Sequence, residues 1–203
     1  MKITTRDRMI IGAADLLKRR GMHATSIREV VRHSETPRGS ITHHFPGGKK
    51  ELLEAAIKYA GEEVSGPLTQ LLAAHGPIKG LELFVGAWRK TLIDTSFDAG
   101  CAVLAVTVEQ YTSDQRSEAD QVLERQIHQQ LLSQAHEIFC GWQRLISESL
   151  HNSGIDSARA DSLALMTIAA IEGSVALCRA ARSTLPLDRI WEQMRNLLEH
   201  EVV

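Results

Sequence analysis

No proline occurs between Pro77 and Pro186, and apolar residues in this stretch recur at intervals of three and four. Proline interrupts helices, and strict alternation of apolar and polar residues would indicate strands, so the stretch predicts long helices and no sheet. The helices expected here are 78–94, 101–111, 117–150, 156–183 and 187–201, with an interruption of the third near Gly141 left open. We therefore predict an all-α fold.

The N-terminal residues predict three short helices, each preceded by a residue able to cap it. Thr4 or Thr5 caps the first, which ends at Arg20 with Gly21 as its stop. Ser26 caps the second, 27–33, and Glu29 completes a capping box. Thr36 caps the third, 37–44, and Pro37 is its first residue because that position needs no N–H donor.

Residues 49–64 predict a strong fourth helix with apolar residues at helical spacing. Beyond it, Gly66-Pro67 and Gly76-Pro77 are expected to bracket a short helix, 68–74.

The helix predicted at 37–44 is polar and positively charged, and it follows a tight break at Ser34 and Glu35. Its only apolar anchors are Ile41 and the adjacent Phe45. A helix with a purely structural role would carry more apolar residues, whereas a helix presented to a DNA major groove has this composition.

The charges are distributed unevenly along the chain. Residues 1–50 carry 11 Lys and Arg against 4 Asp and Glu, a balance of +7, whereas the remaining residues carry −9. A basic end on an acidic body indicates contact with a polyanion, although a chance excess on a solvated face gives the same numbers.

The segment TPRGSITHHFPGGKKEL, residues 36–52, resembles the recognition-helix region of the TetR family of bacterial transcriptional regulators. The extra glycine in PGGKK resembles the LmrA/YxaF-like branch, as does SFDAGCAVLAVTVE at 96–109. One departure is Thr42, which stands where the family often has a tyrosine.

The resemblance implies a three-helix, helix-turn-helix DNA-binding domain at 1–50, joined through helix 49–64 to a helical-bundle ligand-binding and dimerisation domain at 51–203. It implies a homodimeric repressor of a palindromic double-stranded operator. An aromatic or amphipathic small molecule would release it from the operator. No Gly-rich phosphate loop, HExxH or GxSxG motif occurs, so no enzyme activity and no cofactor are expected, and the scattered cysteines are consistent with the cytoplasm. The residues implied in DNA binding are Ser26, Arg28, Thr36, Arg38, Gly39, Ser40, Thr42, His43, His44 and Lys49.

Aromatic residues of the central helices suit an apolar pocket for a small molecule, and they suit an ordinary core equally well. With the resemblance, they imply an effector site. The residues expected to line it are Phe84, Trp88, Phe97, Tyr111, His136 and Phe139.

The helix predicted at 156–183 is apolar on both of its sides, which predicts burial all round. A second copy of the chain would bury the outer side, as the resemblance implies. A central core helix in a monomer is the alternative.

Two other classes of function remain open from the residues alone. Glu124, His128 and His136 lie at helical spacing and could hold a metal in a bundle, which would make this a metal protein or enzyme. A dimeric ligand-binding protein that has lost DNA binding is the third class.

Cys101, Cys140 and Cys178 lie far apart and outside any zinc-binding spacing, so we expect reduced thiols, with a reactive sensor cysteine as the alternative. No apolar run approaches the roughly 18–20 residues of a membrane helix, so no membrane contact is expected.

Overall fold

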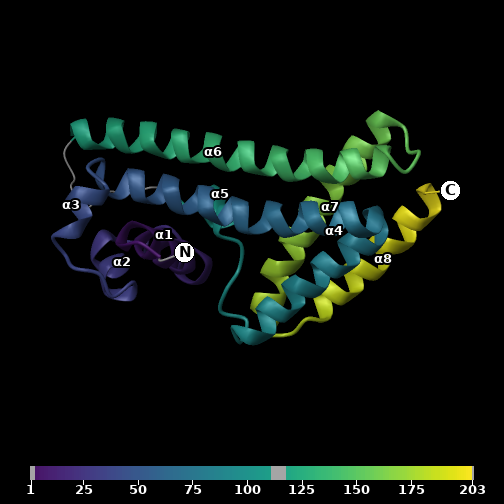
Figure 1. The fold of residues 1–203 in the computed structure, drawn as a ribbon, viewed down its shortest axis with the longest axis horizontal. Coiled ribbons are helices and arrows are strands. Elements are labelled where there is room, and N and C mark those ends of the chain that lie inside the picture. Colours follow the sequence, from purple (N-terminus) through teal and green to yellow (C-terminus); the bar gives the residue numbers. More distant parts are fainter. Residues whose placement is uncertain (1–2, 111–117, 203) are drawn as a thin grey trace. The chain divides into compact units, whose positions relative to one another are not determined.

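The structure, a computed structural model, describes residues 3–110 and 118–202, and every regular element in those stretches is a helix (Figure 1). The all-α prediction is confirmed. In chain order the helices are α1 (Thr5–Arg20), α2 (Ile27–His33), α3 (Ser40–His44), α4 (Gly48–Asp94), α5 (Ala102–Val108), α6 (Glu118–His151), α7 (Ser157–Ala181) and α8 (Leu185–Glu201).

The chain forms two compact units. The first comprises Met1–Glu62 with Cys101–Ile138, and the second comprises Glu63–Gly100 with Phe139–Val203. α4 and α6 each contribute residues to both units. The functional boundary expected near residue 50 stays a prediction. Continuous helices connect the two units here, so no linker marks the end of a domain.

The start and end of α1 follow the predicted capping. Thr4 Oγ1 accepts from the Asp7 N–H at 3.1 Å, and the Asp7 carboxylate accepts from the Thr4 N–H at 3.0 Å. The Thr4 hydroxyl also donates to the Asp7 carboxylate at 2.7 Å, and this bond, together with the one from the Thr4 N–H, lowers the pKa of Asp7. At the other end, Gly21 takes a φ of 77°, a conformation that favours glycine, and ends the helix.

α2 is capped by Ser26, whose Oγ accepts from the Glu29 N–H at 3.2 Å. The expected capping box is only half formed, because the Glu29 carboxylate accepts a bond from the Arg32 guanidinium instead. The same carboxylate lies 3.6 Å from the Arg20 guanidinium. Neighbouring arginines therefore neutralise the charge of Glu29, which makes no bond to the N-terminus of α2.

α3 begins three residues later than predicted. Thr36 does not cap it, because its hydroxyl bonds to Ser34 Oγ at 2.9 Å and its N–H donates to the Val31 carbonyl at 3.1 Å. Pro37 instead opens a turn closed by the Ser40 N–H on the Pro37 carbonyl at 3.0 Å. The break before it is tight because Glu35 adopts a left-handed φ of 50°.

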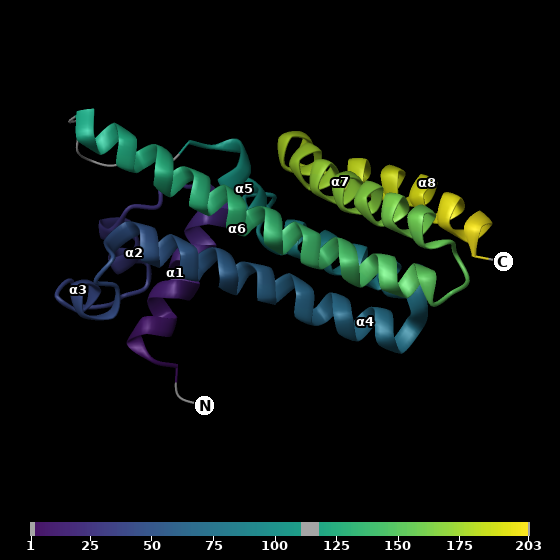
Figure 2. The same cartoon turned by 90° about the horizontal axis from the view of Figure 1, so that it is seen from above.

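The turn between α2 and α3 packs directly on α1. A Cβ added at Gly12 would lie 3.0 Å from Ser34 Cβ, so glycine at this position allows the close approach. Ser34 Oγ also donates to the Val30 carbonyl at 2.6 Å and holds the turn against the end of α2. The three short helices lie together in both views (Figures 1 and 2).

α4 continues through Gly66 and Pro67, where a break was predicted. Both residues are exposed, and Leu68 beside them is 1% exposed, so core packing outweighs the missing proline N–H. The break predicted at Gly76-Pro77 is confirmed: Gly76 has a left-handed φ of 72°, and the helix resumes at Pro77.

The first unit also contains α5 and the start of α6. Val106 of α5 and Leu131 of α6 are fully buried, and the Gln134 amide donates to the Glu54 carbonyl of α4 at 2.9 Å. After α5, the Glu109 carboxylate accepts the His23 N–H at 3.0 Å. This bond ties residue 109 to the turn between α1 and α2.

In the second unit, α7 and α8 lie side by side (Figures 1 and 2). An Arg159–Glu201 ion pair joins their far ends, and Arg89 of α4 pairs with Asp188 of α8 at 2.5 Å. α6 passes through Gly141 without interruption.

α7 corrects the expectation about membrane segments. Among the described residues it is one helix long and apolar enough, by length and composition, to cross a bilayer. α7 meets this criterion because it has many small and apolar residues and few charges. The core helix of a soluble protein meets the same criterion.

Candidate nucleic-acid interface and ligand cavity

The short helix α3 presents a polar face outward. Ile41 and Phe45 are 8% and 1% exposed and hold the helix to the first unit. Arg38, Thr42 and His43 are exposed around it, whereas Ser40 and His44 are half-buried. The two histidine rings meet edge to face, 5.0 Å apart. Two apolar anchors under a polar, basic surface suit a helix that enters a DNA groove.

Gly39, at the start of α3, is not required by the fold of this chain. Its φ of −67° is open to any residue, and an added Cβ would meet nothing within 4 Å. A glycine that neither backbone strain nor internal packing demands leaves room for the close approach of another molecule.

Arg38, just before α3, is an exposed cation that can contact an outside anion. Arg20 and Arg32 both pair with Glu29, and the bond from Arg32 lowers the pKa of that carboxyl, so it stays ionised at neutral pH. Arg6 lies over the Phe45 ring, 5.0 Å from its centre. By contrast, Arg38 makes no ion pair with any residue in the described ranges.

Most of the predicted DNA-binding residues gather around α3, with some exceptions. Arg28 is exposed on α2, and Lys49 is half-buried in the first turn of α4. Ser26 is half-buried, and its hydroxyl caps α2. Thr36 is only 7% exposed and its hydroxyl is bonded to Ser34, so the structure does not present it to an outside phosphate.

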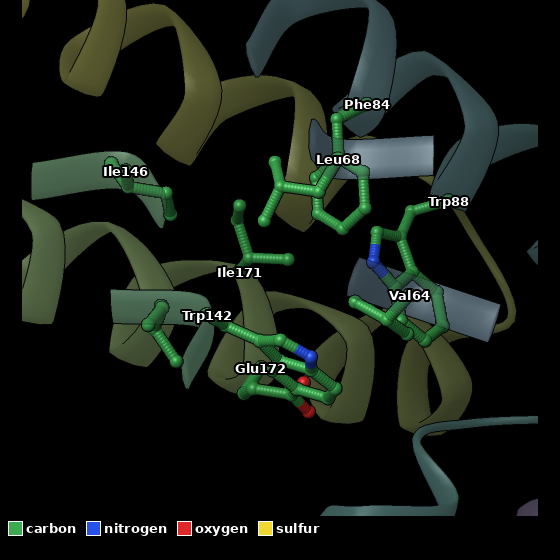
Figure 3. A pocket seen from close by; sticks show the side chains of 9 residues that line it. Val64, Leu68, Phe84, Trp88, Trp142, Ile146, Ile171 and Glu172 are labelled. Carbon is green, nitrogen blue, oxygen red and sulfur yellow. The ribbon is translucent and has the colours of Figure 1, made fainter. Parts of the chain in front are cut away.

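The second unit contains a small cavity, about 20 Å³ in volume, between α4, α6 and α7 (Figure 3). Phe84 and Trp88, two of the predicted ligand-binding residues, line it. So do Trp142, another of the aromatic residues of the central helices, and Glu172, which sequence reasoning did not assign to the site. Glu172 left a detectable signal, because it is a lone acidic residue in the apolar stretch Leu163–Cys178.

The other predicted ligand-binding residues do not line this cavity. Phe97 lies in the turn after α4 with a φ of 62°, and His136 is exposed on α6. Phe139 packs edge to face on Trp142, with ring centres 5.1 Å apart. Tyr111 lies outside the described residues.

The metal alternative gains no support from the part of the chain that is described. It holds no group of three or more His, Cys, Asp or Glu side chains placed for a metal. His128 and His136 lie on α6, and the side chain of Glu124 is outside the described set.

The cysteines are free thiols. Cys178 is buried, and burial raises its thiol pKa, which disfavours the reactive thiolate that a sensor needs.

Two family models match the chain. Residues 77–193 match the C-terminal domain of LmrA/YxaF-like transcriptional regulators, and residues 10–56 match bacterial regulatory proteins of the tetR family. The second match contains α2 and α3, the elements that carry the candidate interface.

Among curated proteins, an HTH-type transcriptional regulator of Mycobacterium tuberculosis is 37% identical over 97% of this chain and 95% of its own. The HTH-type transcriptional regulator LmrA of Bacillus subtilis is 24% identical over 96% of this chain and 97% of its own.

Solved structures share the fold. A regulatory protein TetR from Rhodobacter sphaeroides aligns with a TM-score of 0.76 at 17% identity, covering 93% of this chain and 96% of that one. A TetR transcriptional regulator from Legionella pneumophila aligns with a TM-score of 0.75 at 21% identity, with both chains fully covered. On the strength of the two matched domains and the near full-length relatives, the chain belongs to the TetR family of DNA-binding bacterial transcriptional regulators, in its LmrA/YxaF-like branch.

Proposed function

We propose that this protein is a cytoplasmic homodimeric repressor that leaves a palindromic operator when a small molecule binds in its second unit. The observation that carries the DNA-binding part is the outward polar face of α3, with Arg38 exposed and without an ion pair among the described residues. TetR-family regulators bind operators and small-molecule effectors and form dimers. In a two-fold dimer, two such helices would read half-sites about one DNA turn apart, or a multiple of that spacing.

The dimer part of the proposal is supported by α7. Its outer side exposes Leu165, Met166 and Leu177, which are 57%, 38% and 56% exposed. Small residues lie between them, and α8 adds Leu185, which is 57% exposed. A continuous apolar stripe of this kind on one unit is typical of a protein–protein interface.

The release mechanism requires an effector that distinguishes two shapes of the protein. Equal affinity for the DNA-competent and DNA-incompetent shapes would change nothing, however tight the binding. α4 is one covalent connection between the two units, because it supplies Phe84 and Trp88 to the cavity and the buried residues Leu52 and Ile57 to the first unit. An aromatic or amphipathic effector suits the cavity lining.

Binding to DNA from immediately upstream of the protein's own coding region, measured across a salt series, tests the DNA-binding part. We expect specific binding that weakens roughly 10³- to 10⁵-fold between 50 and 200 mM salt, since a dimer that makes about six to ten phosphate contacts displaces that many counterions. Random DNA of equal length is the control. Equal affinity for both DNAs at every salt concentration would contradict sequence-specific binding at this site.

Replacing Arg38 by alanine separates base contact from phosphate contact. If Arg38 reads a base edge, we expect Arg38→Ala to weaken operator binding by about 1–3 kcal/mol and to relax base preference at one position of each half-site. Arg19→Ala, another exposed arginine of the first unit, is the matched control, because Arg19 pairs with Asp15. An equal loss on operator and random DNA would assign Arg38 to the phosphate backbone.

A further inference from the structure

The end of α5 places a carboxylate on the turn between α1 and α2, which leads into the helices of the candidate DNA interface. Glu109 follows α5 directly, is half-buried, and accepts the His23 N–H at 3.0 Å. α5 itself is firmly held, because Val103 and Val106 are 1% and 0% exposed and the helix packs against α1. The carboxylate therefore meets a main-chain group of the turn from a fixed support.

The carboxylate lies against this turn more closely than any residue other than glycine would allow. A Cβ added at Gly21 would overlap the Glu109 carboxylate. Gly21 therefore has two uses in the turn. Its left-handed φ ends α1, and its missing side chain leaves the space that the carboxylate fills.

The turn is held internally as well, so it moves as one piece. Thr25 is 1% exposed, and its hydroxyl donates to the Gly21 carbonyl at 2.7 Å. Ser26, the next residue, caps α2, and α2 leads through the tight turn at Ser34 to α3. A displacement of the α1–α2 turn would therefore reach α2 and, through it, the helix proposed to enter the DNA groove.

The charge of Glu109 does not favour its position. An acidic side chain in the first unit opposes the approach of a polyanion. The carboxylate also contacts Gly21 at the C-terminal end of α1, where the helix dipole favours cations. What Glu109 contributes to the turn is therefore a hydrogen-bond acceptor in a fixed place.

We propose that Glu109 is a positioning residue for DNA binding. It holds the α1–α2 turn so that α2 and α3 already have, in the free protein, the arrangement that fits DNA. A protein that must order this turn on binding loses affinity in proportion to the fraction of molecules that lack the arrangement. The inference rests on the DNA-binding part of the proposed function and is independent of release by a small molecule.

Three substitutions of Glu109 separate the reach of its side chain from its charge. Glu109→Ala removes both, Glu109→Asp keeps the charge on a shorter side chain, and Glu109→Gln keeps the reach and an oxygen acceptor without the charge. We expect Glu109→Ala and Glu109→Asp to bind an operator selected from random DNA about 3- to 30-fold more weakly than wild type, since one hydrogen bond to a charged group contributes at most about 10- to 100-fold. Glu109→Gln should stay within about threefold of wild type.

The sign of the alanine result distinguishes positioning from electrostatics. Loss of a negative charge by itself strengthens binding to DNA, so equal or tighter binding by Glu109→Ala would overturn the proposal. Binding is measured at a temperature at which circular dichroism shows every variant to be folded. Gln110→Ala, at the exposed neighbouring residue, is the matched control and should bind like wild type.

A salt series separates positioning from direct contact with DNA. Glu109→Ala should shift the affinity by the same factor at every salt concentration, because the number of phosphates contacted in the complex is unchanged. A shallower dependence on salt than in wild type would show that a phosphate contact is lost, and would contradict a role in the free protein.

Hydrogen exchange of the free, full-length protein tests the contact without DNA. We expect faster exchange at residues 21–33 in Glu109→Ala and Glu109→Asp, and wild-type exchange there in Glu109→Gln and Gln110→Ala. Unchanged exchange in Glu109→Ala, or equal acceleration in α7 and α8, would overturn the proposal. A wild-type protein that prefers no DNA sequence would instead contradict the DNA-binding part of the proposed function, so the two failures are distinguishable.

Discussion

Replacing Phe45 by alanine should cost about 3–5 kcal/mol of unfolding free energy and abolish operator binding. Phe45 is 1% exposed at the end of α3, and Arg6 lies over its ring. α3 has only five residues, and Ile41 is its only buried one, so removal of the ring leaves the helix with a single apolar anchor. Urea unfolding followed by circular dichroism, together with operator binding at the same temperature, measures both effects.

Phe45→Leu is the matched control, because it retains most of the apolar volume. We expect it to cost less than about 1.5 kcal/mol and to retain operator binding. If Phe45→Ala instead bound the operator like wild type, contacts other than this ring would hold α3 in place, and the two-anchor account of the interface would be wrong.

Replacing Leu177 by aspartate should convert the proposed dimer to a monomer. Leu177 is 56% exposed and lies in the apolar stripe of α7, near the C-terminal end of the helix. Burial of a leucine contributes about 1.5–3 kcal/mol, and two-fold symmetry counts the loss twice, so we expect dimerisation to weaken roughly 10²- to 10⁴-fold. Sedimentation equilibrium over a concentration series measures the change.

Ile93→Asp is the matched control for the dimer experiment. Ile93 is 55% exposed, nearly the same as Leu177, but it lies near the end of α4 and outside the stripe. It should leave the association state unchanged. A wild-type protein that sediments as a monomer, or a Leu177→Asp variant that remains dimeric, would show that this stripe is not the interface.

Local sequence determined the caps and the helix-forming segments. Thr4, Ser26 and Gly21 act where expected, because a cap depends on a side chain and backbone groups within three or four residues of it. The basic charge of residues 1–50 and the pattern of residues 36–52 are also properties of contiguous sequence. They therefore indicated a DNA-binding element without any knowledge of the tertiary packing.

Tertiary structure decided the features in which distant residues compete with local preference. Gly66-Pro67 and Gly76-Pro77 both indicate a break, yet only Gly76 departs from the helix, because Leu68 is buried beside Pro67 and α4 continues there. Thr36 has the side chain of a cap, but Ser34 and Val31 engage it first, and α3 begins at Ser40.

The ligand cavity shows the same division. Its aromatic character could be predicted from the sequence, because most of the few aromatic residues of the chain fall in its central part. Which of them meet depended on how three helices pack, so Trp142 joined Phe84 and Trp88 while Phe97 did not. Glu172 joined the lining only because packing buried it, since periodicity predicts which helix face is apolar but not what an isolated acidic residue on that face will contact.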